Sequence, residues 1–429
     1  MYAAGGRSLS VGDGGAGPDT MPAMSQDPIL PSVSDLLERA VSAVPAPLRP
    51  QVEEAVRTYK EMLMEARAPK LMFLGRRGAG KSSLVNALCG EPVATIGSVL
   101  SETGRPSWYT ARTPKGDLRL LDTRGIGDRT RPEAANFQHA LDEIRAALTE
   151  DWPDAILFLC KAKDVDSHIG EDLANIREVR RFLLERHRYD APVVAIVTQV
   201  DELDPKRVEP PYDNPAKQEN IQTAVKTLEE ALSELGIGLA RVIPVSAYAE
   251  FDAEGRRTYD NYWNIDALVE YLVEVLPRSA QVQMARLSRI RAVQAKTARK
   301  MTAAAAALAA GIAATPIPVA DILPITATQV GLITGIAYLS GRELSKEAAK
   351  EFLVALGANL GAAFALRELA RAVGKIALPV GGELLSAGVA AAGTWGIGEA
   401  AVAYFIENRT IEEAKERFRR KKKEKEERT

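Results

Sequence analysis

The 429-residue sequence predicts an α/β domain, a three-layer sandwich, followed by an all-α apolar helical domain. Three observations lead to this prediction. A glycine-rich loop joins an apolar strand to a helix close to Gly75. Further apolar strands alternate with helical segments as far as Pro277, a pattern typical of a parallel sheet with helices on both faces. From Ala303 to Ile406 the chain is rich in alanine, glycine and larger apolar residues, which indicates closely packed helices.

The glycine-rich loop follows the apolar run Leu71–Leu74 and precedes a helical segment, Ser82–Leu88. Its sequence fits the pattern G-x4-G-K-[ST], in which backbone N–H groups surround a phosphate with the helix dipole behind them. We expect the Lys81 amine to reach the β- and γ-phosphates of a nucleoside triphosphate and the Ser82 hydroxyl to hold Mg²⁺. The alternative is a glycine-rich turn that contains Lys-Ser by chance. The residues predicted to contact the nucleotide in this loop are Gly75, Arg76, Gly78, Ala79, Gly80, Lys81, Ser82 and Ser83.

Polar residues also stand at the ends of the later strands. The predicted strand Asp117–Leu121 ends in Asp122, a position that suits a carboxylate on the Mg²⁺ side of the nucleotide. Gly125 follows shortly after, and its missing side chain allows the backbone N–H to approach a γ-phosphate. Two more apolar strands run into polar segments that complete the predicted site, namely Thr198-Gln199-Val200-Asp201 and Ser246-Ala247.

In this order the P-loop, D-T-x-G, T-x-x-D and S-A segments resemble the G1, G3, G4 and G5 motifs of translation-factor-class GTPases, in particular the Era-like and septin-like bacterial GTPases. The resemblance implies a P-loop GTPase sandwich that binds GTP or GDP with Mg²⁺. It implies that Asp201 accepts hydrogen bonds from guanine N1 and the exocyclic amine, which adenine cannot reproduce. Gln199 stands where the family usually has lysine, so we expect weaker binding without a change in specificity. The other residues carried over to the base side are Thr198, Ser246 and Ala247.

The resemblance also implies residues that respond to the γ-phosphate. Spacing favours Thr103 as the switch I threonine, although Thr95 and Thr110 lie in the same interval and an ordinary polar loop residue is the alternative. The expected Mg²⁺ ligands are Ser82, Thr103 and Asp122.

Hydrolysis is expected to be slow, because Ile126 occupies the position where Ras-like enzymes carry a water-orienting glutamine. An arginine close to the γ-phosphate can raise the rate by about 10³–10⁵. Arg77 and Arg124 lie within the nucleotide loops and are the candidates, with solvent-facing charge as the alternative. The residues predicted to take part in hydrolysis are therefore Lys81, Thr103, Gly125, Arg77 and Arg124.

Composition excludes several other classes. A net charge of −2 gives no overall nucleic-acid signature. Cys89 and Cys160 fall on a predicted helix and a predicted strand, so we expect buried free thiols instead of a disulfide. The three histidines are scattered without metal-ligand spacing. The metal expected in this protein is therefore the Mg²⁺ that accompanies the nucleotide.

The pattern divides the chain into five segments. The first 32 residues are rich in glycine, serine and proline and lack the basic start and apolar core of a signal peptide, so we expect a disordered extension on a cytoplasmic protein. A helical segment (33–68) should pack on the GTPase domain or on the C-terminal region. The remaining segments are the GTPase domain (69–277), the hydrophobic helical domain (278–412) and a charged tail (413–429). Within the GTPase domain, residues 202–216 are predicted to form an irregular surface insertion.

Three interpretations of the apolar region stay open. Ile322–Gly341 is about long enough to span a bilayer, and Gly331 and Gly335 have the spacing of close helix packing in lipid. The first interpretation is association of residues 303–406 with a membrane, at the inner face of the cytoplasmic membrane. The second is a soluble helical bundle, and the third is a homo-oligomer formed through an exposed apolar face.

The turn Pro316–Ile322 and the following Thr328-Gln329 resemble a hydrophobic C-terminal domain of unknown function found on some Era-like GTPases. We therefore expect a GTPase whose nucleotide state controls the helical domain. One alternative is a ribosome- or RNA-associated assembly GTPase, against which counts the missing KH-type G-x-x-G loop in the C-terminal third. The other is a scaffold that binds GTP without significant hydrolysis.

Overall fold

The computed structural model describes residues 38, 46, 49–93, 106–122, 135–166, 169–234, 241–313, 322–342, 352 and 387–427. The predicted N-terminal extension (1–32) lies outside the described residues, as do the candidate site residues Thr103, Arg124 and Gly125.

A six-stranded sheet forms the centre of the molecule, in the order β2-β3-β1-β4-β5-β6. β2 pairs antiparallel with β3, and the other neighbours are parallel. This mixed sheet confirms the predicted α/β class. The sequence analysis missed β2 and a separate short hairpin, β7–β8. The strands are β1 (Lys70–Gly75), β2 (Ser107–Thr113), β3 (Gly116–Asp122), β4 (Ala155–Lys161), β5 (Val193–Thr198), β6 (Val242–Pro244), β7 (Ala249–Phe251) and β8 (Arg257–Asp260).

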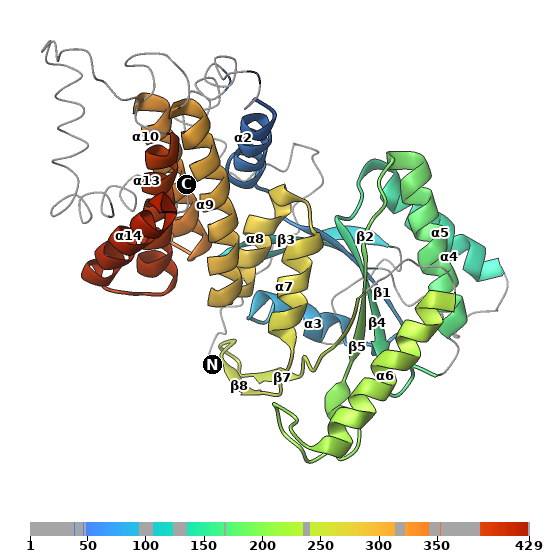
Figure 1. Cartoon of the computed structure of the whole chain (residues 1–429). Coiled ribbons are helices and arrows are strands. Elements are labelled where there is room, and N and C mark those ends of the chain that lie inside the picture. Colours follow the sequence, from blue (N-terminus) through green and yellow to red (C-terminus); the bar gives the residue numbers. More distant parts are fainter. Residues whose placement is uncertain are drawn as a thin grey trace, which may run out of the picture.

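Helices cover both faces of the sheet and complete three layers (Figure 1). Side chains along β1 alternate between two hydrophobic cores: Leu71 and Phe73 face one, while Met72 and Leu74 face the other. The second core is closed by α4 (Ala135–Glu150), α5 (Ile169–His187) and α6 (Pro215–Glu234). The first core is closed by α3 (Lys81–Cys89), α7 (Ile265–Val275) and α8 (Arg278–Ser288).

The C-terminal helices form a bundle beside the sheet domain (Figure 1). The helix α2, expected to pack on either region, contributes to one core that continues from the sheet into the bundle. The Tyr59 hydroxyl of α2 donates to the Thr328 carbonyl at 3.0 Å, and an added Cβ on Gly331 would overlap that hydroxyl. Small residues therefore allow these helices to approach closely. The bundle comprises α2 (Arg49–Leu63), α9 (Arg291–Ala313), α10 (Ile322–Leu339), α13 (Ala387–Ala401), the π-helical turn η2 (Val402–Ile406) and α14 (Ile411–Glu426).

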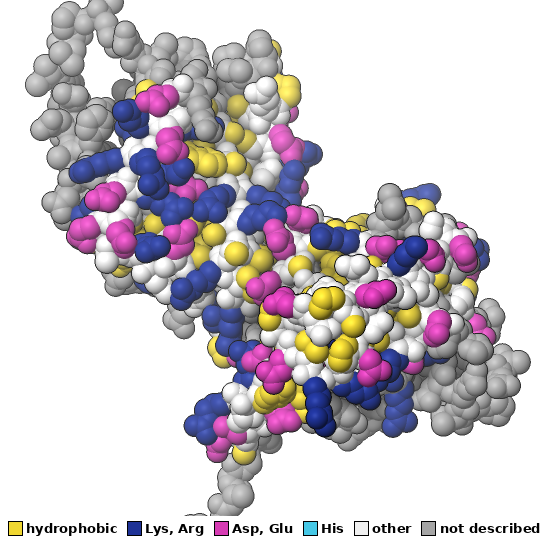
Figure 2. Space-filling model, turned by 60° about the horizontal axis from the view of Figure 1, so that its bottom comes forward, with side chains coloured by type: hydrophobic (Ala, Val, Ile, Leu, Met, Phe, Trp, Pro, Cys, Tyr) yellow, Lys and Arg dark blue, Asp and Glu magenta, His cyan; other side chains and the backbone are white. Residues whose placement is uncertain are grey.

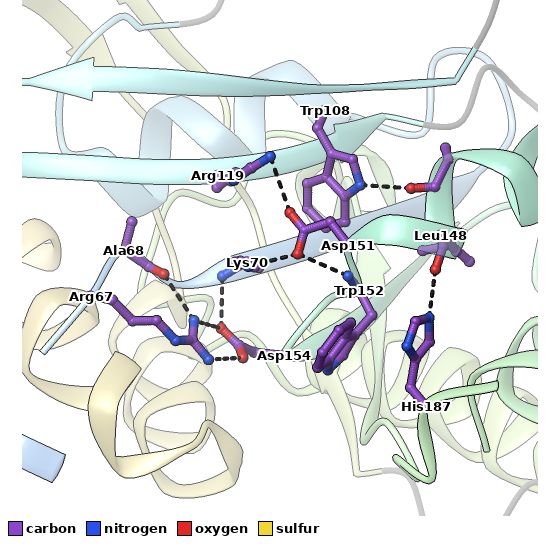
Figure 3. A network of polar contacts seen from close by, with 11 residues as sticks. Arg67, Ala68, Lys70, Trp108, Arg119, Leu148, Asp151, Trp152, Asp154 and His187 are labelled. Carbon is purple, nitrogen blue, oxygen red and sulfur yellow. Dashed lines mark hydrogen bonds and ion pairs between the residues drawn. The ribbon is translucent and has the colours of Figure 1, made fainter. Parts of the chain in front are cut away.

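Ion pairs at the linker between α2 and β1 hold it on the amino-terminal edge of the sheet (Figure 3). Arg67, which follows α2, donates both terminal guanidinium nitrogens to the Asp154 carboxylate at 2.6 and 2.8 Å. Its backbone N–H donates to the Ser279 carbonyl of α8 at 2.8 Å. Lys70 at the start of β1 pairs with Asp151 at 2.6 Å. One linker thus joins α2, α8 and the sheet at the edge opposite the predicted nucleotide loops.

Acidic and basic side chains are interspersed on the face of the molecule shown in Figure 2. The predicted charged tail is largely helical, because α14 covers Ile411–Glu426. A capping box starts this helix: the Thr410 N–H donates to the Glu413 carboxylate at 2.8 Å, and the Glu413 N–H donates to the Thr410 hydroxyl at 3.3 Å. Four consecutive basic residues, Arg420 to Lys423, pair with glutamates three or four residues further on, so part of the charge of the helix is balanced locally.

Among the described residues, one helical stretch has the length and apolar composition of a membrane-spanning helix, namely Gly388–Ile406. About 61% of its most apolar part is buried inside the molecule, as is common for a core helix. The helix α10 (Ile322–Leu339, 18 residues) forms almost the whole of the expected span Ile322–Gly341. A helix of about 20 apolar residues is needed to cross a bilayer.

Candidate nucleotide-binding site

The loop between β1 and α3 has the backbone that the predicted phosphate loop requires. Gly75 has φ 155°, and an added Cβ would lie 2.6 Å from the Leu159 carbonyl oxygen of β4. Gly80 is left-handed, with φ 84°, directly before the first residue of α3. Only glycine adopts both conformations without strain, so these two positions fix the curl of the loop.

Lys81 is the first residue of α3, and its side chain folds back over the loop. Its Nζ donates to the carbonyls of Gly75 at 2.9 Å and Arg76 at 3.3 Å. Ser82 and Ser83 follow in the first helical turn and are half-buried. The Lys81 amine and the first turn of α3, which carries the positive end of the helix dipole, therefore both lie at the loop.

The two arginines of the loop have different surroundings. The Arg76 guanidinium pairs with Asp172 of α5 at 2.9 Å. Burial raises the pKa of the Asp172 carboxyl, and the charge of Arg76 partly opposes this shift. Arg77 is exposed. Arg76 therefore anchors the loop to α5, whereas Arg77 is the loop arginine that is open to a substrate.

Asp122 is the last residue of β3 and lies opposite Phe73 of β1 in the parallel register. It also pairs with Ser107, the first residue of β2. β2 therefore begins, and β3 ends, at the edge of the sheet where the phosphate loop lies. Thr103, Arg124 and Gly125 are outside the described residues, so their predicted roles stay predictions.

The predicted base-side segment is hydrogen-bonded to the phosphate loop. The Thr198 hydroxyl, 3% exposed, donates to the Ala79 carbonyl at 2.9 Å. The Gln199 amide donates to the Gly78 carbonyl at 2.7 Å, and its backbone is left-handed with φ 58°. The glutamine that replaces the family's lysine thus bridges two loops far apart in the sequence.

Asp201 lies in the single 3₁₀ turn η1 (Val200–Glu202) that follows and is half-buried. Ser246 is fully buried, and its backbone exchanges hydrogen bonds with Trp263 at 3.0 and 3.2 Å. Ala247, the next residue, is half-buried. The parallel pairing of β5 and β6 brings the T-x-x-D and S-A segments to the same edge.

Sequence reasoning missed a lysine beside the loop. Lys161 is the last residue of β4, and its Nζ would lie 3.4 Å from a Cβ added to Gly78. It borders a cavity of about 160 Å³ whose lining residues are Lys161, Lys163, Asp164, Gln199 and Glu202. Its position at the carboxyl end of a parallel strand was the signal that could have identified it, because ligands of such sheets bind at that edge.

Residues 70–199 match a family described as "50S ribosome-binding GTPase". The match contains the phosphate loop, Asp122, Thr198 and Gln199. Residues 70–199 belong to the P-loop GTPases. Residues 278–427, beyond this GTPase domain, match a domain of unknown function, DUF697.

The GTPase domain is similar to two bacterial proteins. GTPase Era of Streptomyces coelicolor is 29% identical over 215 residues, which cover 49% of this chain and 55% of Era. GTPase Der of Streptococcus sanguinis is 27% identical over 133 residues, which cover 31% of this chain and 27% of Der. The chain thus spans about half or less of the length of these relatives. A solved structure of Toc33 from Arabidopsis thaliana with Mg²⁺ and GMPPNP aligns with a TM-score of 0.35 and 17% identity, over 55% of this chain and 95% of Toc33.

Proposed function

We propose that this chain binds GTP together with Mg²⁺ and hydrolyses GTP to GDP and phosphate. The observation that carries the proposal is the direct connection between the two predicted halves of the site. Thr198 and Gln199 donate to carbonyls of the phosphate loop at 2.9 and 2.7 Å. The protein segments that contact the phosphates and the base of a nucleotide must lie at a fixed separation. These two hydrogen bonds fix that separation. The GTPase family match of residues 70–199 supports the same assignment.

The residues of the loop fit a phosphate chain and its metal. The Lys81 amine and the amino-terminal end of α3 provide positive charge and N–H donors. The Ser82 hydroxyl and Asp122, at the end of the neighbouring strand, are oxygen donors of the kind that Mg²⁺ prefers. When bound, Mg²⁺ neutralises phosphate charge. Lys81 adds a second positive charge, and the exposed Arg77 is one candidate for a contact with the γ-phosphate, with Arg124 as the other.

We propose further that the nucleotide state is transmitted to the helical domain through the β2–β3 hairpin. The hairpin begins directly after the Thr103 segment and ends at Asp122, so both strands connect to segments expected to contact the γ-phosphate. Its tip lies at the opposite end, against the C-terminal helices. Arg286 of α8, 6% exposed, donates to the Lys115 carbonyl of the tip at 2.5 Å and to the Tyr338 carbonyl of α10 at 2.9 Å.

The same arginine lies over the Tyr338 ring, with 3.7 Å between the guanidinium carbon and the ring centroid. The Tyr338 hydroxyl donates in turn to the Gln283 side chain of α8. Buried polar groups of this kind are costly when they lose a partner. A displacement of the hairpin tip therefore requires α8 and α10 to move or to lose hydrogen bonds.

We propose the inner face of the cytoplasmic membrane, or a second copy of the chain, as the target of residues 303–406. The apolar helix Gly388–Ile406 supports a lipid or protein contact. Its Glu399, 3% exposed, pairs with Arg299 and Arg417, which disfavours complete insertion into a bilayer. Liposome flotation of the full chain with GDP and with a non-hydrolysable GTP analogue distinguishes these targets. Flotation in one state supports a switched membrane contact, whereas a nucleotide-dependent change in mass by light scattering without flotation supports self-association.

A ribosomal partner is the second candidate, favoured by the description of the matching family as ribosome-binding. Co-sedimentation with ribosomal subunits in the GTP-analogue state, and not in the GDP state, would support it.

Phosphate release from GTP and from ATP tests the enzymatic proposal. We expect Mg²⁺-dependent release from GTP above the protein-free control and much less from ATP. Tight GTP binding without release above that control would favour the non-hydrolysing scaffold. Absence of both binding and release would contradict the proposed function.

A further inference from the structure

A fully buried lysine lies directly behind the turn that carries Asp201. Lys217, in the first turn of α6, is 0% exposed. Its Nζ donates to the backbone carbonyls of Asp201 at 2.8 Å and Leu203 at 2.6 Å. Burial of an ammonium group costs on the order of several kcal/mol of hydration free energy. The group therefore needs hydrogen-bond acceptors in fixed positions. The lysine and the turn therefore hold each other in one arrangement.

An aromatic ring completes the surroundings of the ammonium group. The Lys217 Nζ lies 5.1 Å from the ring centroid of Tyr212, which is also 0% exposed. Burial lowers the pKa of Lys217, while the carboxylates of Asp201 and Asp204 oppose the shift. The charge is thus balanced by carbonyl dipoles, a ring face and two acidic neighbours, all of which lie between Asp201, the last residue of the T-x-x-D motif, and Tyr212.

The rest of the first two turns of α6 fixes the same segment. The Gln218 side chain donates to the Tyr212 carbonyl, and the Asn220 side chain donates to the Asp204 carbonyl, both at 2.9 Å. The segment was predicted as an irregular surface insertion. It is irregular and mostly exposed, as predicted, except that Tyr212 is buried, and its carbonyls accept side-chain donors from α6.

Tyr212 also links the two base-side motifs. Its ring centroid lies 5.3 Å from that of Trp263. Trp263 pairs through its backbone with Ser246, the serine of the S-A motif. One chain of contacts therefore runs from Lys217 through the buried Tyr212 and the half-buried Trp263 to the buried Ser246.

We propose that Lys217 is a positioning residue for guanine recognition: together with Tyr212 it holds the Asp201 turn at the angle at which the carboxylate meets both N–H groups of the base edge. This inference rests on the proposed function. Two parallel hydrogen bonds demand alignment, and a displacement of about 1 Å can cost about 100-fold in an enzyme site. If the Asp201 turn were released from Lys217, the hydrogen bond from the exocyclic amine of the base would be lost first.

The test compares GDP with IDP, which lacks the exocyclic 2-amino group, in equilibrium binding to the full chain with Mg²⁺. For the native chain we expect GDP to bind more tightly than IDP. For Lys217→Met we expect GDP affinity to fall about tenfold and IDP affinity to change little. The ratio of GDP affinity to IDP affinity should therefore also fall about tenfold. The matched control is Lys226→Met, an exposed lysine on the same helix, for which both affinities should stay unchanged.

A second variant, Gln218→Ala, tests the inference if Lys217→Met does not fold. Gln218 is half-buried, and Gln218→Ala removes only its bond to the Tyr212 carbonyl, so it should lower the same ratio by a smaller factor. An equal fall for GDP and IDP in the folded variants would indicate a purely structural role and overturn the inference, as would an unchanged ratio in Gln218→Ala when Lys217→Met is unfolded. Failure of the proposed function is distinguishable, because the native chain itself would then bind neither nucleotide or show no preference.

Discussion

The Gln283 side chain of α8 occupies the space directly above Gly116 at the start of β3. A Cβ added to Gly116 would overlap the Gln283 amide, and the φ of +131° at this glycine already disfavours other residues. The Gln283 side-chain oxygen also accepts a hydrogen bond from the Tyr338 hydroxyl. The hairpin tip and the helical domain therefore meet at a contact that only glycine permits.

Gly116→Ala should uncouple the two regions. Displacement of Gln283 breaks its link to α10, so a hydrogen-exchange difference in α8 and α10 between GDP and GTP-analogue states should disappear, while nucleotide affinity changes less than about threefold. Gly255→Ala, at another left-handed glycine with φ +77°, is the control for backbone strain. A persistent exchange difference in Gly116→Ala would contradict the proposed route.

Lys81→Ala should abolish nucleotide binding. The substitution removes the amine that lies over the loop carbonyls, and we expect at least about a 100-fold loss of affinity for GDP, measured with a fluorescent analogue. Lys226→Ala, on the exposed side of α6, should bind as the native chain does. Native-like binding by Lys81→Ala would rule out the loop as the phosphate site.

Asp201→Asn should shift the preference from guanine toward xanthine nucleotides. The amide offers a donor where the carboxylate accepts, which matches the additional carbonyl of xanthine. Competition of XDP and GDP for the site measures the change. The control Asp213→Asn makes the same chemical change at an exposed position in the segment that follows. Unchanged guanine selectivity in Asp201→Asn would refute the base assignment.

Glu399→Gln should destabilise the helical bundle. Glu399 is 3% exposed and pairs with Arg299 at 2.9 Å and Arg417 at 3.1 Å. Removing its charge leaves Glu407 as the shared partner of Arg299 and Arg417. Because these arginines are partly solvated, we expect a loss of about 2 kcal/mol in the free energy of unfolding, less than for a fully buried pair. Thermal unfolding measures it, with the exposed Glu427→Gln as the control; equal midpoints for the two variants would show that the network adds no stability.

The elements that were predicted correctly have local causes. β1, β4 and β5 are apolar runs buried on both faces, and such runs can be recognised in the sequence without knowledge of tertiary contacts. The phosphate loop can be recognised in the sequence because its backbone geometry alone requires glycine at Gly75 and Gly80. β2 was missed because it is an edge strand of mixed polarity that pairs only with β3.

Other features depend on contacts between distant residues. Lys217 and Arg286 are charged residues on helices, and both are buried because backbone carbonyls outside their own helices accept their hydrogen bonds. Tyr212 lies in a proline-rich segment that resembles a surface loop in sequence. Its burial follows from α6 and Trp263, which the local pattern does not reveal.

The guanine-nucleotide assignment is the central claim, and calorimetric titration of GDP and of ADP into the full chain with Mg²⁺ tests it most directly. We predict saturable binding of GDP at one site per chain, with ADP weaker by at least about 100-fold, as expected for a site that hydrogen-bonds a group the competitor lacks. Equal affinity for the two nucleotides, or binding of neither, would contradict the account.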